Sequence, residues 1–165
     1  MDISISDVIH RAVGEYKRSG NVDLVKLIDD LGIPVYVKDV PDSDSVAKLI
    51  FNEDEDVYEI EINNNARFDS KLIRTKVAVE FAKLVNEVEE ESTEEDLFNL
   101  ASSILLPDEI INDFINSKNI KKEELGVFND SLIDDLCSTF EVPHTVAALR
   151  LQKLGYLSNK VIDCG

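Results

Sequence analysis

The sequence predicts an α+β protein in which helices are combined with a small three-stranded antiparallel sheet. Apolar residues recur at helical spacing over the first 32 residues and again from about residue 69 onward. Between these regions lie three short segments that are rich in β-branched and aromatic residues and bounded by turn-forming residues. With 165 residues, 44% of them hydrophobic, the chain is long enough for one domain with a buried core, or for one domain with a small helical extension.

Two helices are expected before the sheet. In the first, apolar residues from Ile5 to Tyr16 fall on one helical face, and Gly20 can end the helix. Asn21 can cap the second helix, which Gly32 ends. The expected strands cover residues 33–38, 47–51 and 57–62. In the third strand apolar and acidic residues alternate, which is typical of a strand with one face on a core and one in water.

Five helices are expected in the remainder of the chain, over residues 73–84, 93–104, 107–115, 131–140 and 143–154. Thr93, with Asp96 three positions later, can form a capping box at the start of the second of these, and Pro107 suits the first turn of the third. We therefore expect a main domain over residues 1–127 and a C-terminal helical pair over residues 128–165 packed on it.

The chain is strongly acidic, and its acids are clustered. Lys and Arg number 17 against 34 Asp and Glu, which gives a formal charge of −17 and disfavours binding to a phosphate backbone. One acidic stretch comprises Glu53, Asp54, Glu55, Asp56, Glu59 and Glu61. The other comprises Glu87, Glu89, Glu90, Glu91, Glu94, Glu95 and Asp96. Such stretches are solvated faces or docking surfaces for a basic partner, and we assign the second role to residues 53–56 and to Glu87, Glu89, Glu90 and Glu91.

Simple features indicate a cytoplasmic protein whose His and Cys residues have ordinary roles. The N-terminus lacks a signal-peptide pattern, and no run of about 18 apolar residues occurs, so neither secretion nor a membrane span is expected. Cys137 and Cys164 are too few for a disulfide framework, and Cys137 lies on an apolar helix face, which favours burial over nucleophilic chemistry. His10 and His144 are expected at the surface or near a helix start.

Three segments of the chain carry a resemblance to a known family. Residues 74–84 read RTKVAVEFAKL, residues 97–107 read LFNLASSILLP after Glu94, and residues 136–155 read LCSTFEVPHTVAALRLQKLG. In order and spacing they resemble the ImmA/IrrE metallopeptidases, whose pattern places R-F-T-x-A-H-E-x-x-H on one helix and E-x-x-A-N-x-F-A-A-x-L-L-M-P on the next. The resemblance implies a zincin-like fold over nearly the whole chain, with a helix-turn-helix-like pair at the C-terminal end.

The resemblance also points to a site that has lost its chemistry. In the family, two His one turn apart bind zinc, and the Glu between them is the general base for the metal-bound water. Val79 and Lys83 stand at the two His positions, whereas Glu80 matches the general base and Glu94 the third ligand. One carboxylate cannot hold zinc in this way, and an ammonium repels a dication, so the resemblance implies a pseudo-metallopeptidase with no catalytic residue, metal or other cofactor.

Lys83 suggests a structural role for the former site. Placed between Glu80 and Glu94, its ammonium could replace part of the lost metal charge as an ion pair. The alternative is that Lys83 points into water from a solvated helix face.

The C-terminal helical pair has helix-turn-helix proportions, which raises the question of DNA binding. Insertion into a major groove requires basic and polar residues on the second helix. That helix offers only Arg150 and Lys153 on a chain with a charge of −17. Direct nucleic-acid binding is therefore not expected, and packing of the pair against the main domain is favoured.

The resemblance implies a function by binding. Family members occur in phages and mobile elements, often beside a helix-turn-helix repressor that the peptidase cleaves. A member that cannot cleave could still act as an antirepressor by holding such a repressor, or could inhibit another basic regulatory or defence protein. Two alternatives stay open: an acidic DNA mimic that occupies a nucleic-acid-binding protein, and a metallopeptidase with a non-standard metal site that uses Glu80 and Glu94.

Overall fold

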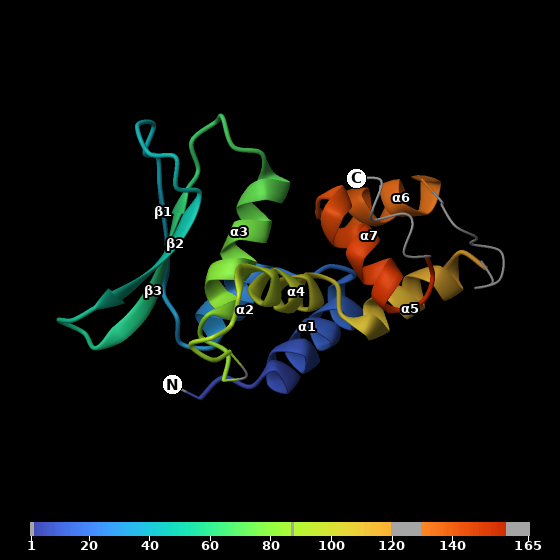
Figure 1. The fold of residues 1–165 in the computed structure, drawn as a ribbon, viewed down its shortest axis with the longest axis horizontal. Helices are drawn as coiled ribbons and strands as arrows, with labels where there is room; N and C mark the ends of the chain where they lie inside the picture. Colours follow the sequence, from blue (N-terminus) through green and yellow to red (C-terminus); the bar gives the residue numbers. More distant parts are fainter. Residues whose placement is uncertain (1, 87, 120–129, 158–165) are drawn as a thin grey trace.

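The computed structural model describes residues 2–86, 88–119 and 130–157, and these form an α+β fold, as the sequence predicts (Figure 1). In chain order the elements are α1 (Ile5–Ser19), α2 (Leu24–Asp30), β1 (Val35–Lys38), β2 (Ala47–Asn52), β3 (Val57–Asn63), α3 (Ser70–Ala82), α4 (Glu94–Leu105), α5 (Asp108–Ser117), α6 (Asp130–Phe140) and α7 (His144–Lys153). None of the helices in this described part is long and apolar enough to cross a membrane.

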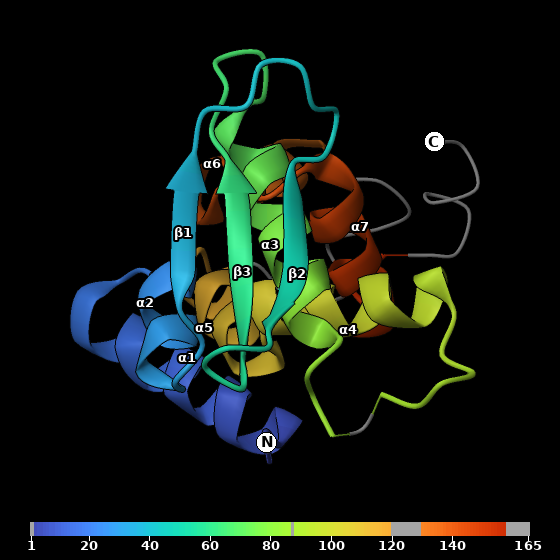
Figure 2. The same ribbon diagram turned by 90° about the vertical axis from the view of Figure 1, so that its left-hand side faces the viewer.

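The three strands form one mixed sheet in the order β1-β3-β2, with β3 in the centre (Figure 2). β2 and β3 pair antiparallel across a short turn, as predicted. β1 pairs with β3 in parallel, in a register that sets Val35 opposite Ile60, so the prediction of an all-antiparallel sheet is wrong for this strand. The cause is the connection after β1, which carries the chain past β3 to the far edge of the sheet. β2 therefore runs back along that edge, and β3 then runs through the centre of the sheet parallel to β1.

Helices cover one face of the sheet, and the other face is open (Figure 2). Ile60 and Ile62 of β3 are buried against the side on which α3 packs. The neighbouring Glu61 points to the opposite face because successive strand residues alternate, and it forms ion pairs there with Lys38 and Lys48. The predicted alternation of core-facing apolar residues with solvent-facing acidic residues in this strand is thus confirmed.

Side-chain caps fix where several helices begin. The N-cap side chains that accept a backbone amide are those of Ser4, Asp23, Asp69 and Thr93. The capping box of Thr93 and Asp96 is confirmed, since each side chain accepts the backbone amide of the other. The predicted cap of α2 is wrong: Asn21 accepts the amide of Val22, and Asp23 is the cap.

The C-terminal helices α6 and α7 share one continuous apolar core with the rest of the fold. The ring of Phe140 on α6, for example, packs against Tyr16 of α1 and Phe114 of α5, with ring centroids 5.9 and 5.6 Å apart. The predicted domain boundary between residues 127 and 128 lies outside the described residues, as do Glu87 and Cys164.

Candidate functional site

Helix α3 positions three of the four residues of the degenerate site. The Asp69 side chain accepts the amide of Leu72 at 2.8 Å and starts the helix, which runs to Ala82. Val79 and Glu80 therefore lie in its last turn, and Lys83 is the C-cap. A positive charge at this end is favoured by the helix dipole, which gives Lys83 a reason to be here that involves no metal.

Lys83 pairs with Glu80, and the pair lies at the surface. The Lys83 ammonium is 2.7 Å from Oε2 of Glu80, with 42% of the lysine side chain and 15% of the glutamate side chain exposed. Exposed helical pairs of this spacing contribute about 0.3–0.5 kcal/mol. Because one partner is well exposed, the ion pair is a weak structural feature.

Glu94 is not brought into this pair. It is the exposed first residue of α4, where the dipole at a helix N-terminus favours acidic side chains. Among the described residues it forms no ion pair, and Lys83 has Glu80 as its single ion-pair partner. Since no ion pair joins Glu94 to Lys83 among the described residues, the expected arrangement of an ammonium between two carboxylates is reduced to the Glu80–Lys83 pair.

The ordinary roles expected for His10, His144 and Cys137 agree with where these side chains lie. Both His side chains are exposed. Cys137 is 7% exposed on α6, and burial raises the pKa of its thiol, which lowers the thiolate fraction needed for nucleophilic chemistry. Within the residues that the structure describes, no three His, Cys, Asp or Glu side chains gather in a way that could hold a metal ion.

The helical pair α6–α7 presents fewer basic groups than its sequence offers. Arg150 is only 6% exposed, because its Nε donates to the carbonyl oxygen of Leu106 at 2.9 Å and its guanidinium pairs with Asp108. Of the two basic residues noted on α7, Lys153 alone is exposed. A groove-reading role for this helix thus has even less support than the sequence suggests.

Residues 53–56 of the first acidic stretch form the turn between β2 and β3, and its other two acids, Glu59 and Glu61, lie on β3. The Asn52 side chain accepts the amides of Asp54 and Glu55 at 3.0 and 3.2 Å and holds the turn, and Asp56 adopts a left-handed backbone with φ of 54°. The carboxylates of residues 53–56 are all exposed. Beside them, Phe51 and Tyr58 are 46% and 36% exposed, with ring centroids 5.0 Å apart. The turn therefore combines negative charge with an exposed aromatic pair.

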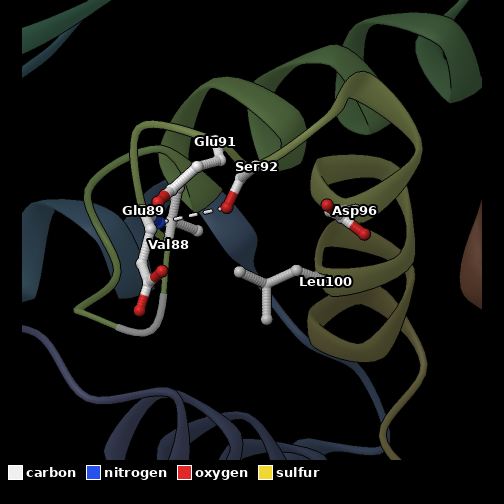
Figure 3. A pocket seen from close by; sticks show the side chains of 6 residues that line it. All are labelled: Val88, Glu89, Glu91, Ser92, Asp96 and Leu100. Carbon is white, nitrogen blue, oxygen red and sulfur yellow. Dashed lines mark hydrogen bonds between the residues drawn. The ribbon is translucent and has the colours of Figure 1, made fainter.

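The second acidic stretch borders a pocket of about 430 Å³ between the loop that precedes α4 and α4 itself (Figure 3). Ser92 accepts the amide of Glu89 at 3.0 Å and so folds the loop back on itself. Figure 3 shows Leu100 extending from α4 toward this loop, with Asp96 on the same helix. The pocket is lined by Val88, Glu89, Glu91, Ser92, Asp96 and Leu100. Two apolar side chains, Val88 and Leu100, thus lie beside three acidic ones in the pocket wall.

The β2–β3 turn and the loop before α4 both lie in the lower half of the molecule, at two separate places (Figure 1, Figure 2). In Figure 1 the β2–β3 turn is at the left-hand tip and the loop before α4 lies nearer the N-terminus; in Figure 2 the turn is below the sheet and the loop is to its right. We refer to residues 53–56 and 88–91 together as the acidic patches. Residues 53–56, 89, 90 and 91 were singled out from the sequence, whereas the pocket residues Val88 and Leu100 were not.

A second hollow of about 430 Å³ was missed altogether by sequence reasoning. It lies between α3, α4 and the start of α7, and Val79 is part of its wall together with Leu72 of α3 and Phe98 of α4. One signal could have found it: Leu72, Thr75 and Val79 recur at i, i+3 and i+7, which places them along one line of α3. Val79 thus faces this hollow, which neither Glu80 nor Lys83 lines.

No family model matches this sequence, and a search of curated proteins gave no match. The resemblance to ImmA/IrrE metallopeptidases therefore rests on the sequence motifs alone.

Proposed function

We propose that this chain is a non-catalytic protein, similar to the ImmA/IrrE metallopeptidases, that acts by binding a basic protein partner through its acidic patches. The observation that supports this most directly is the pocket before α4, in which Val88 and Leu100 offer apolar contact beside Glu89 and Glu91. Such a site suits a lysine or arginine side chain, whose aliphatic stem packs on apolar groups while its charge meets a carboxylate.

The β2–β3 turn supplies a second contact of the same kind. Its four carboxylates are exposed, and the Phe51–Tyr58 pair beside them offers aromatic faces to a cation. Clustered charge of one sign also raises the rate at which an oppositely charged partner associates. A basic partner could therefore contact carboxylates and apolar or aromatic side chains both at the β2–β3 turn and at the pocket before α4.

Absence of catalysis is proposed from the residues at the former metal positions. Val79 carries no ligand atom. The ammonium of Lys83 is paired with the carboxylate of Glu80, the group that would act as the general base in the resembled motif. By resemblance to the family, we propose a cytoplasmic regulator from a phage or mobile element, whose partner is a helix-turn-helix repressor or another basic regulatory or defence protein. Binding without turnover would require stoichiometric amounts of this protein.

The test compares three variants of equal charge. One neutralises the turn (Glu53→Gln, Asp54→Asn, Glu55→Gln), one neutralises the loop (Glu89→Gln, Glu90→Gln, Glu91→Gln), and the control neutralises exposed acids elsewhere (Asp29→Asn, Asp42→Asn, Asp134→Asn). A partner captured on the wild-type protein from its native cell is identified and purified, and its Kd for each variant is measured by calorimetry. The turn and loop variants should each bind about tenfold more weakly than the control. Equal affinity of all three variants would contradict the proposal.

The two clusters of exposed carboxylates, residues 53–56 and 89–91, also favour a second candidate, an acidic mimic of DNA. A DNA mimic would compete with duplex DNA for its partner, and its binding would depend almost wholly on charge. Raising the salt concentration should then abolish binding, because the charges are screened. A partner that also packs on Val88 and Leu100 should retain measurable affinity at high salt, which separates the two candidates.

A further inference from the structure

The hollow between α3, α4 and α7 has chemistry opposite to that of the acidic patches. Its volume of about 430 Å³ lies in the range of pockets that bind ligands. In Figure 1 α7 lies beside α3, with α4 below them. We refer to this hollow as the α3–α7 groove.

The walls of the α3–α7 groove are apolar and come from three elements. They include Leu72 and Val79 of α3, Phe98 of α4, and Pro143, the N-cap of α7. Leu72 is 39% exposed, although large apolar side chains elsewhere in the described core are almost fully buried. Val79, Phe98 and Pro143 are half-buried. Covering this surface would remove apolar area from water, which is favourable.

Two lysines of α3, Lys71 and Lys76, border the same groove. Neither forms an ion pair within the described residues, although eight other Lys or Arg side chains of this part of the chain pair with a carboxylate. The one carboxylate in the groove wall, that of Asp69, already accepts the amide of Leu72 as the cap of α3. The start of α7, which has no side-chain cap, adds the positive end of a helix dipole. The groove is therefore locally basic on a strongly acidic protein.

We propose that the α3–α7 groove binds a peptide segment of another protein that carries large apolar side chains next to carboxylates. The groove follows α3 from Lys71 to Val79, a rise of about 12 Å, so it has the length of a short segment. Apolar side chains of the segment cover Leu72, Val79 and Phe98, and its carboxylates meet Lys71 and Lys76. This inference is independent of the proposed function, because the acidic patches attract segments of the opposite charge.

The test is a selection from a random twelve-residue peptide library displayed on phage, carried out on the wild-type protein at physiological ionic strength. Peptides enriched in both apolar and acidic residues are expected. Their synthetic forms should shift the backbone amide resonances of Thr75, Val79 and Thr145 in ¹⁵N-edited NMR spectra, because these residues lie in the groove wall. Enrichment of basic peptides alone, or no enrichment, would overturn the proposal.

Two charge-reversal variants separate a local effect from a global one. Lys71→Glu with Lys76→Glu places acids in the groove, whereas Arg11→Glu with Lys153→Glu makes the same change of charge at exposed positions outside the groove wall. The selected acidic peptides should bind the first variant about tenfold more weakly than the second. The apolar contribution is measured with Leu72→Ser, a substitution of an exposed side chain that should leave the fold intact. Peptides that bind all of these variants equally would overturn the assignment, even if the basic partner of the acidic patches still binds.

Discussion

Arg150 of α7 is held by the carbonyl oxygen of Leu106, the last residue before the proline that separates α4 from α5. The Nε–O distance is 2.9 Å, and the same guanidinium pairs with Asp108, the first residue of α5. One buried side chain thus connects α7 to the ends of two other helices. From the sequence, Arg150 is one of two basic residues on α7 that could contact nucleic acid. In the structure it is buried and has a structural role.

Replacement of Arg150 by Met should lower the free energy of unfolding by about 2 kcal/mol, because the hydrogen bond is charged and its acceptor would be left without a donor. Urea denaturation followed by circular dichroism measures the change. Lys153→Met is the matched control, since that lysine is exposed on the same helix, and it should change stability by about 0.5 kcal/mol or less. Equal effects of the two substitutions would show that Arg150 contributes no more than a surface side chain.

Much of the fold could be predicted from local sequence. Helical spacing located the helices, and the pairing of Thr93 with Asp96 identified the start of α4, since a capping box involves only four consecutive residues. The direction of β1 could not be predicted. Whether Val35 pairs with β3 in parallel depends on the path of a connection between strands, and this path leaves no periodic signal in the sequence.

The candidate site was predictable only in part, because its parts come from different elements. The resemblance grouped Glu94 with Glu80 and Lys83, but Glu94 is the first residue of α4 and forms no ion pair with Lys83 among the described residues. The wall of the α3–α7 groove joins Leu72 to Pro143, which are far apart in sequence. The packing of helices against one another determines which distant residues become neighbours. No periodic pattern in a single sequence reports that packing.

Lys83→Ala is expected to change stability by only about 0.5 kcal/mol. The reason is that its pair with Glu80 is an exposed helical one, with 42% of the lysine side chain in solvent. Thermal or urea unfolding measures the change, with Lys76→Ala as a control for an exposed lysine of the same helix that forms no ion pair among the described residues. A loss several times larger than that of the control would indicate that Lys83 also interacts with Glu94, as a structural replacement of the metal would require.

Purified protein is expected to contain substoichiometric zinc, because Val79 and Lys83 provide no ligand at the two histidine positions of the resembled motif. Elemental analysis by mass spectrometry, after dialysis against buffer without chelator, measures the content. Glu80→Gln and Glu94→Gln serve as comparisons and should leave the content unchanged. Stoichiometric zinc that disappears in either variant would refute the pseudoenzyme proposal and favour a metallopeptidase with a non-standard site.

Cys137 should make stability depend on pH in the alkaline range. Burial raises the pKa of its thiol from the ordinary value of 9.0, so the folded state holds the proton more tightly than the unfolded state. The corresponding stabilisation is fully present below the unfolded pKa and is lost as the pH rises through the folded pKa.

The measurement compares Cys137→Ala with the parent protein, both carrying Cys164→Ser, by urea denaturation between about pH 8 and about pH 10.5. Tyr16, whose pKa is also raised, by burial and by its hydrogen bond to Asp113, titrates in both proteins and cancels in the comparison. The stability difference between them should therefore shrink as the pH rises, because only the parent must keep a thiol protonated. A difference that stays constant across this range would mean that the Cys137 thiol ionises as readily in the folded protein as in the unfolded chain.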